Sequence, residues 1–459
     1  MLLFGPAAFA EDGEVVVAET NGDYAEYSLD VADLSSEALE ESDSAEEALC
    51  KRLLIVGDDG LDLTGLEGVS SIVSSSDGLY VAQFDDASAA DAAFDRLSSW
   101  SSVYSVEYDT SVESINSHHM NIASVSSSAK HLSWGANFIG ADNYISRIKS
   151  TGSRRVVIAV VDSGVDISHS FLSSRMIRGF NFVDNNSNTS DVNGHGTHVA
   201  GIIADCTLGV NGISIMPVRA LEENGYGEVS AIGSSLLYAC DNGADIINFS
   251  VGGPRSSYLE AVVKRIIKRD VALVAASGNE ASDIEYIGSC PAYIDEVITV
   301  GAVRRDNRVE QFSNYGRKLD FMAPGSAINS SVPNGKYAVY SGTSMAAPHV
   351  AASIALLEME YGNLSNSTIE SLLKRSCRKY PDTSLYGNGI IDLKNLAASI
   401  SGQKIEISNK SYVYSGKANK PKVKVSRNGQ SLFSGSDYSV SYSNNTNVGT
   451  AKVVVRGKG

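Results

Sequence analysis

Residues 193–201 read NGHGTHVAG and place a histidine between two glycines. Upstream, residues 160–164 read VVDSG, with an aspartate at the end of an apolar run. Downstream, residues 341–348 read SGTSMAAP, with a serine just before an apolar stretch. The chain therefore presents an acid, an imidazole and a hydroxyl in the order Asp, His, Ser. Because unrelated folds that use these three groups place them in different orders, this order points to one fold.

The local context of each group suits chemistry. Asp162 follows five apolar residues and is predicted at the carboxyl end of a strand, where α/β sheets build their sites. Flanking glycines let the backbone approach His195 closely. Ser344 is predicted at a helix N-terminus, whose dipole favours nearby negative charge. Structural roles are predicted for the neighbouring candidates Asp166, His198 and His349.

The sequence between these groups alternates strands and helices. Continuous apolar runs, typical of strands buried on both faces, occupy residues 156–161, 245–250, 271–276 and 297–300. Helical spacing is found in residues 198–203, 229–242, 258–269, 344–360 and 367–377. The fold class predicted is α/β, with a parallel sheet flanked by helices.

With the longer string GTSMAAPHVA at residues 342–351, the chain resembles the subtilisin family of serine proteases over residues 132–400. The resemblance implies a serine endopeptidase that works through an acyl-enzyme. Ser344 would be the nucleophile, His195 the general base and acid, and Asp162 the group that fixes the imidazole tautomer. The string AASGN ends in Asn279, which matches the family's oxyanion-hole amide beside the Ser344 backbone N–H.

The resemblance also implies a peptide or protein substrate held as an added strand. The residues that match the two binding stretches are Ser250, Val251, Gly252, Gly225, Tyr226 and Gly227. Val251, Ala276 and Gly278 would line the first pocket, which favours an uncharged or apolar residue before the cut bond.

No cofactor and no metal are expected. Residues 169–172 read HSFL where the family often carries a calcium-binding carboxylate, and the loop after Gly201 is shorter than in calcium-binding members. No His/Cys cluster has zinc-like spacing.

The N-terminal quarter is strongly acidic. Residues 1–115 hold 26 acidic and 3 basic residues, a net charge of −23, whereas the remainder carries +6. Residues 1–10 are interpreted as a signal-peptide remnant, 11–48 as an acidic leader and 116–131 as a cleavable connector. The pattern of residues 49–115 predicts a small α+β domain, and its position before a subtilisin-like body resembles that family's inhibitory propeptide. We expect one self-cleavage within residues 110–131, with the propeptide then bound as an inhibitor and released by salt and acid.

Residues 403–459 show period-two strands and resemble a partial bacterial immunoglobulin-like β module, which could bind a cell surface. No run could span a bilayer, so we expect a secreted or surface-associated bacterial protein. The charge makes nucleic acid an unexpected partner. The five cysteines leave disulfides and buried free thiols both open.

Two other functions fit the sequence less well. A peptide ligase or macrocyclase on the same scaffold would keep every catalytic residue. A surface adhesion protein with an inactive protease-like domain would have a broken triad or lack the oxyanion asparagine, and all four residues are present.

Overall fold

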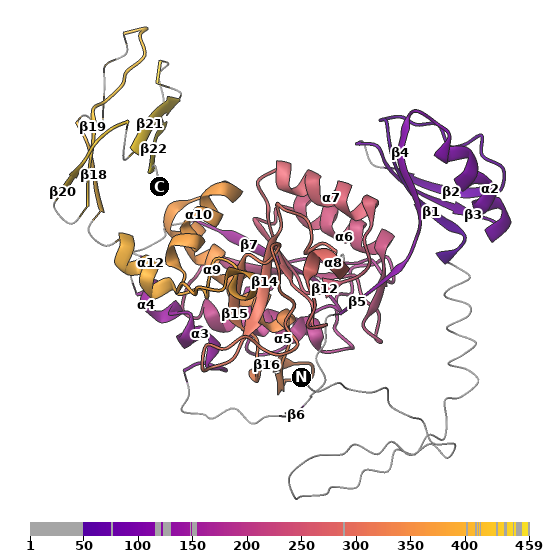
Figure 1. Cartoon of the computed structure of the whole chain (residues 1–459), viewed down its shortest axis with the longest axis horizontal. Helices are drawn as coiled ribbons and strands as arrows, with labels where there is room; N and C mark the ends of the chain where they lie inside the picture. Colours follow the sequence, from indigo (N-terminus) through magenta and orange to yellow (C-terminus); the bar gives the residue numbers. More distant parts are fainter. Residues whose placement is uncertain are drawn as a thin grey trace, which may run out of the picture.

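The computed structural model describes chiefly residues 49–74, 77–114, 121–122, 130–146, 154–287 and 290–400, with most of 403–457 (Figure 1). The proposed signal remnant, the acidic leader and most of the connector lie outside the described residues.

A seven-stranded parallel sheet forms the centre of the molecule. Its strand order is β15-β14-β13-β11-β7-β9-β8. The strands are β15 (Phe321–Pro324), β14 (Ile298–Val303), β13 (Ala272–Ala276), β11 (Ile246–Phe249), β7 (Val156–Asp162), β9 (Ile213–Arg219) and β8 (Phe180–Asn181). The predicted parallel α/β sheet is confirmed.

Helices cover both faces of this sheet, which explains why its strands are apolar throughout. Helices α5 (His195–Cys206) and α9 (Thr343–Tyr361) pack on one face, and α6 (Val229–Asp241) and α7 (Ser257–Lys268) on the other. In β7, Ile158 belongs to the first core, whereas its neighbour Ala159 belongs to the second. Consecutive strand residues point to opposite faces, so a sheet covered twice has no polar side.

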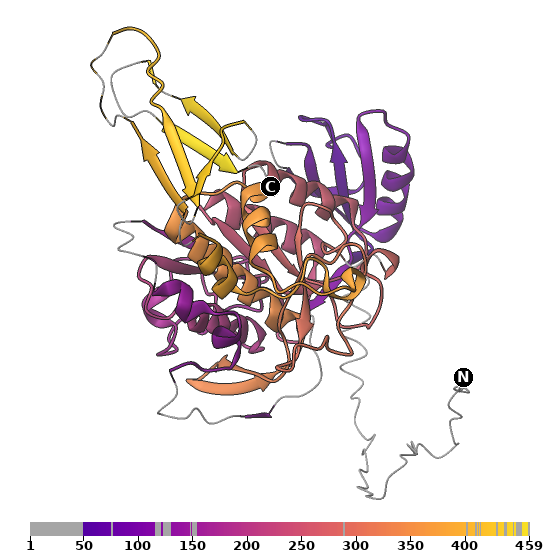
Figure 2. The same ribbon diagram turned by 60° about the vertical axis from the view of Figure 1, so that its left-hand side comes forward.

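The described residues of the N-terminal domain form an antiparallel sheet of order β2-β3-β1-β4 with helix α2. Its elements are β1 (Arg52–Gly57), β2 (Val69–Ser74), β3 (Leu79–Phe84), α2 (Ala87–Ser98) and β4 (Val103–Tyr108). Leu53 and Ile55 pack in the domain's own core with α2, whereas Leu54 is buried in the core of α6 and α7. One face of the domain's sheet is therefore buried against the larger domain, beside which it lies in Figures 1 and 2.

Two small sheets lie at the carboxyl side of the molecule's central strands. One has the order β10-β5-β12, from β10 (Tyr226–Glu228), β5 (Ser111–Ser114) and β12 (Val251–Gly252). The other has the order β16-β17-β6, from β16 (Ile328–Val332), β17 (Lys336–Tyr340) and β6 (Asn121–Ile122).

The remaining helices lie before, between and after the strands of the central sheet in the chain. They are α3 (Gly135–Phe138), α4 (Ala141–Ile145), α8 (Ile284–Ile287), α10 (Asn366–Ser376), α11 (Thr383–Tyr386) and α12 (Leu393–Ile400), with the 3-10 turn η1 (Ser173–Arg175). Among the described segments, no helix combines the length and hydropathy needed to cross a bilayer.

The C-terminal strands form two antiparallel groups. These are β18 (Gln403–Ile407), β19 (Val423–Arg427) and β20 (Gln430–Leu432), and then β21 (Tyr438–Ser443) with β22 (Lys452–Gly457). The all-β character predicted for this segment is confirmed.

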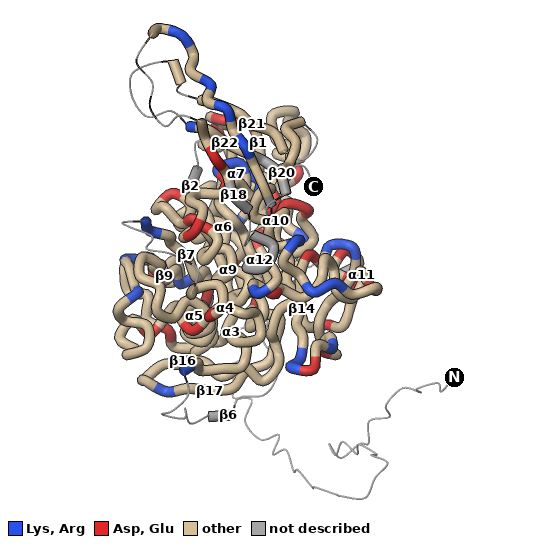
Figure 3. Tube along the Cα trace, turned by 90° about the vertical axis from the view of Figure 1, so that its left-hand side faces the viewer, with Lys and Arg blue, Asp and Glu red and all other residues tan. Residues whose placement is uncertain are grey.

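All five cysteines are free thiols. Cys206, Cys290 and Cys377 are buried, Cys240 is half-buried and Cys50 is exposed. In the view of Figure 3 both charge signs occur over the larger domain. Residues 132–400 hold 23 basic and 26 acidic residues, a net charge of −3, so the positive charge of the remainder lies in the C-terminal segment.

Candidate active site

The aspartate and the histidine predicted from the sequence are in direct contact. Asp162 is the last residue of β7, and His195 is the first residue of α5. His195 Nδ1 lies 2.7 Å from Asp162 Oδ1 and 2.9 Å from Oδ2. Burial alone lowers the pKa of His195, but the Asp162 carboxylate outweighs it, and the net pKa lies above the ordinary value of 6.5. The pair is thus arranged to stabilise an imidazolium.

A second buried carboxylate, which the sequence reasoning did not single out, holds the loop before α5. Asp191 accepts hydrogen bonds from Gly194 N (2.8 Å), Thr197 N (2.9 Å) and Ser163 Oγ (2.9 Å). Burial raises the pKa of Asp191, although these donors oppose the shift. Gly194 adopts a φ of 105°, which favours glycine at the turn into the helix. Asp191 therefore positions His195 without touching it.

Ser344 is the second residue of α9 and is fully buried. Its Oγ donates to the Ser250 carbonyl oxygen (3.2 Å), and Ser250 Oγ donates to the Ser344 carbonyl oxygen (3.1 Å). Since α9 packs against α5, the serine lies on the helix beside the one that begins at His195. Within the described part of the chain, His195 Nε2 is buried without a hydrogen-bond partner.

Asn279 follows β13, at the same sheet edge as Asp162. Its Oδ1 accepts from both Thr343 N and Thr343 Oγ1 at 3.0 Å, which fixes the orientation of the amide. The loop around it is held by Asn314, whose backbone N–H donates to Gly278 O (3.0 Å) and whose side chain donates to Ser277 O (2.9 Å). Asn314 is another supporting residue that no sequence motif revealed.

The two predicted substrate-binding stretches flank a strand from the chain itself. β5 pairs antiparallel with β10, where Tyr226 faces Glu113 and Gly227 faces Val112. On its other side β5 pairs antiparallel with β12. The Ser114 backbone N–H also donates to the Gly225 carbonyl oxygen (2.8 Å). Residues 111–114 therefore occupy the position predicted for a substrate.

One side chain of β5 is buried in the larger domain. Val112 is 3% exposed and belongs to the core that contains Leu221 and Val251. A Cβ on Gly253 would lie 2.5 Å from Val112 Cγ1, so a glycine is needed there for close approach. Ala276 and Gly278 lie at the end of β13, and their role in the first pocket remains a prediction.

The N-terminal domain contacts the larger one through carboxylates at helix N-termini. Glu107 accepts from Ser257 N (2.9 Å) and Tyr258 N (3.3 Å) at the start of α7. Asp109 accepts from Ser230 N (3.1 Å) at the start of α6 and from Arg52. Negative charge is stabilised at helix N-termini, so these contacts are electrostatically matched.

The other titratable candidates have structural surroundings, as expected. His198 Nε2 lies 3.1 Å from the carbonyls of Ile328 and Ala338, and burial lowers its pKa to about 3. Burial likewise lowers the pKa of His349 to about 4. Asp166 accepts from Ser168 N and Asn334 N and closes a loop.

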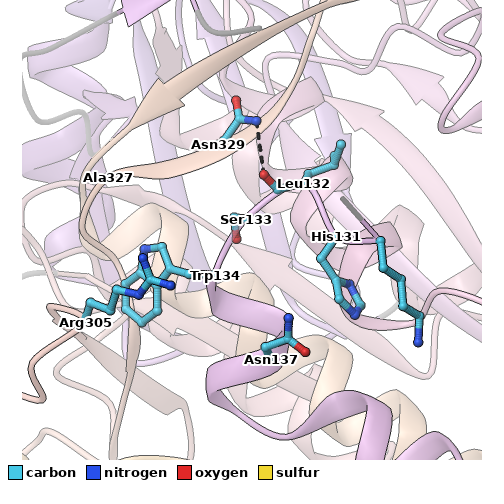
Figure 4. A pocket seen from close by; sticks show the side chains of 9 residues that line it. His131, Leu132, Ser133, Trp134, Asn137, Arg305, Ala327 and Asn329 are labelled. Atoms are coloured by element: carbon cyan, nitrogen blue, oxygen red, sulfur yellow. Dashed lines mark hydrogen bonds between the residues drawn. The ribbon is translucent and has the colours of Figure 1, made fainter. Parts of the chain in front are cut away.

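A pocket of about 450 Å³ lies elsewhere, at the start of the catalytic domain (Figure 4). Trp134 and Arg305 lie on one side of it and His131 and Asn137 on the other, with Asn329 bonded to the Leu132 carbonyl (3.1 Å). None of the predicted site residues lines this pocket. The part of the chain that the structure describes holds no group of three or more His, Cys, Asp or Glu able to bind a metal.

A buried Asp–His pair and a helix-borne serine at the carboxyl edge of a parallel sheet are typical of α/β serine hydrolases. Comparison with known proteins is more specific. The model of the subtilase family matches residues 153–392. "Thermophilic serine proteinase" of Bacillus sp. (strain AK1) is 41% identical over 243 residues, which cover 51% of this chain and 59% of that protein.

Other relatives are matched over more of their length. "Subtilisin DY" of Bacillus licheniformis is 36% identical over 279 residues, covering 59% of this chain and 100% of that protein. "Subtilisin E" of Bacillus subtilis (strain 168) is 35% identical over 336 residues, which cover 71% of this chain and 85% of that protein. The crystal structure of a cold adapted subtilisin-like serine proteinase is 34% identical, with a TM-score of 0.49. The match covers 52% of this chain and 89% of that chain. The chain belongs to the subtilase family, a family of serine endopeptidases.

Proposed function

We propose that this protein is a secreted serine endopeptidase that hydrolyses peptide bonds in proteins, and that it is made as a precursor inhibited by residues 49–115. The observation that carries the proposal is the position of β5 between β10 and β12. Its last residue, Ser114, pairs with Val251, which directly follows Ser250, the residue whose carbonyl accepts from Ser344 Oγ.

The proposed mechanism assigns one role to each group. Ser344 Oγ attacks the substrate carbonyl while His195 Nε2 takes its proton, and Asp162 stabilises the imidazolium. The Asn279 amide and the Ser344 backbone N–H stabilise the oxyanion. The carbon–nitrogen bond then breaks as His195 returns the proton to the leaving amine. Water, deprotonated by His195, hydrolyses the ester and restores Ser344.

The register of β5 supports a particular maturation site. Glu113 faces Gly252 and Ser114 faces Val251 on β12. In an antiparallel pair, each step forward along one strand is a step of one residue backward along its partner. Ile115 lies outside the described residues, and the same register continued by one residue would bring it opposite Ser250.

Ser250 is the residue whose carbonyl accepts from Ser344 Oγ. A peptide carbonyl that reaches this point lies beside the nucleophile. We propose that the bond between Ile115 and Asn116 is the one cut, which falls within the interval expected from the sequence. An isoleucine before the cut bond also agrees with the apolar preference expected for the first pocket.

Inhibition after the cut follows from the same contacts. β5 keeps its pairing with β10 and β12, and Glu107 and Asp109 keep their helix-capping contacts. We further propose that residues 403–459 are an immunoglobulin-like module that contacts the cell surface, since their strands follow the catalytic fold without belonging to its sheet.

The test is intact-mass analysis of the expressed protein. Wild type should yield two fragments with a new C-terminus at Ile115 and a new N-terminus at Asn116, whereas Ser344→Ala should stay whole. Ser353→Ala is the matched control, since it removes another buried hydroxyl of α9, one bonded to the His349 carbonyl. A whole wild-type chain, or cleavage in Ser344→Ala, would contradict the proposal.

A further inference from the structure

The chain is bound as a strand on both sides of the catalytic serine. On the side before the proposed cut, β5 is held by β10 and β12. On the side after it, β6 pairs antiparallel with β17, where Asn121 faces Val339 and Ile122 faces Ala338. The leaving-group side of a substrate is here defined as the part that follows the cut bond.

β17 lies close in sequence to the nucleophile and is the central strand of its sheet. It ends at Tyr340, four residues before Ser344, and β16 covers its other edge. Only seven residue steps separate Ser114 from Asn121, which span at most about 25 Å. A single extended polypeptide bound at the position of β5 can therefore also reach the edge of β17 that β6 occupies.

Strands β16 and β17 are held against helix α5 by side-chain contacts. In β16, Ser330 Oγ donates to the His198 carbonyl (2.7 Å) and Ser331 Oγ donates to the Thr197 carbonyl (3.1 Å), both on α5. The ring of Tyr340 stacks on His198 at 4.2 Å and 5°. Both strands are thus attached to the helix that begins at His195, and the edge of β17 is fixed relative to the catalytic groups.

We infer that the edge of β17 is a binding site for the main chain of polypeptide substrates on the leaving-group side. This inference rests on the proposed function. If the cut falls after Ile115, the pairing engages the sixth and seventh residues of the leaving-group side. Since a strand edge offers backbone donors and acceptors, the site recognises chain length and extended conformation rather than particular side chains.

In the mature enzyme, residues 121–122 stay attached to the catalytic domain. His131 anchors the following segment, with its Nδ1 3.1 Å from Asp205 Oδ1 and with Leu132 N donating to the same oxygen (3.0 Å). A tethered segment competes with substrate at a high effective concentration. The test therefore uses the variant Asn121→Pro/Ile122→Pro, because proline lacks the N–H that a strand donates.

The experiment compares four peptides on this variant. The short peptide is SVESINSH, the sequence of residues 111–118, and the long one, SVESINSHHMNIAS, extends through residue 124. The third is the long peptide N-methylated at the positions of Asn121 and Ile122. The fourth carries alanine at both of those positions. Cleavage is followed by chromatography and mass spectrometry.

We expect kcat/KM of the long peptide to be roughly tenfold above that of the short one. N-methylation should abolish the gain, and the alanine peptide should keep it. Equal kcat/KM for the short and long peptides, an unimpaired N-methylated peptide, or loss of the gain in the alanine peptide would overturn the inference. Failure to cut either the short or the long peptide would overturn the proposed function as well, so the two failures are distinguishable.

Discussion

Truncating Glu107 should accelerate the release of the inhibitory domain from the processed enzyme. The carboxylate accepts from the Ser256 hydroxyl, from Ser257 N at 2.9 Å and from Tyr258 N at 3.3 Å, all at the N-terminus of α7. Hydrogen bonds to a charged group contribute about 1.5–3 kcal/mol. Because Glu107 is half-buried, we take about 2 kcal/mol, which corresponds to roughly 30-fold in the dissociation rate.

The assay follows activation after the processed complex is diluted into a fluorogenic peptide. The lag before full activity reports dissociation of the inhibitory domain, and Glu107→Ala should shorten it roughly 30-fold. Glu67→Gln is the control, since Glu67 is an exposed acid of the same domain. An unchanged lag in Glu107→Ala, or an equal shortening in Glu67→Gln, would refute the helix-capping argument.

Asn279→Ala should keep its thermal midpoint and lose about 10²- to 10³-fold in kcat, measured with a short peptide. Asp162→Asn removes the charge that raises the pKa of His195, so the acid limb of kcat/KM should move to lower pH while the rate falls roughly 10⁴-fold; an unmoved limb would contradict this. Burial raises the pKa of Asp109 in the complex, so a falling pH should slow domain release in wild type relative to Asp109→Asn, measured by the same lag. Residues 1–402 should cut short peptides as fast as the full chain, and a loss of kcat/KM in the shorter form would show that the tail completes the enzyme.

The release of the N-terminal domain by acid and salt stays a prediction, and the surroundings of Asp109 oppose its acid part. From charge alone, acid was expected to release the N-terminal domain. Asp109 is only 2% exposed, and its pKa is raised in the complex, so its protonation favours the bound state. Buried pairs are also screened less than exposed ones, so salt should act mainly through groups other than Asp109.

The central sheet and the Asp–His contact were predictable because local signals coincide with the fold. The run that ends at Asp162 is apolar on every residue, and a parallel sheet covered on both faces requires this. Glycines beside His195 marked the turn into α5. By contrast β2 reads VSSIVS, and its serines hide a strand that pairing with β3 imposes.

The supporting residues were not predictable for a different reason. Asp191 and Asn314 act by hydrogen bonding to backbone groups, Thr197 N and Ser277 O. Because every residue type carries such groups, no sequence pattern marks these contacts. β5 and β6 are strands only because other strands offer them an edge. Such pairings depend on tertiary contacts that no local pattern of residues 111–122 encodes.

The burial of Leu54 of β1 and Leu79 of β3 in the larger domain predicts that the proposed activation is irreversible. Leu54 and Leu79 pack against α6 and α7 rather than inside their own domain. Once the small domain leaves, both side chains face water, and a unit of this size has little stability in reserve. We expect the freed domain to unfold and to be degraded by the protease that it inhibited. The same molecule could then not inhibit the enzyme a second time.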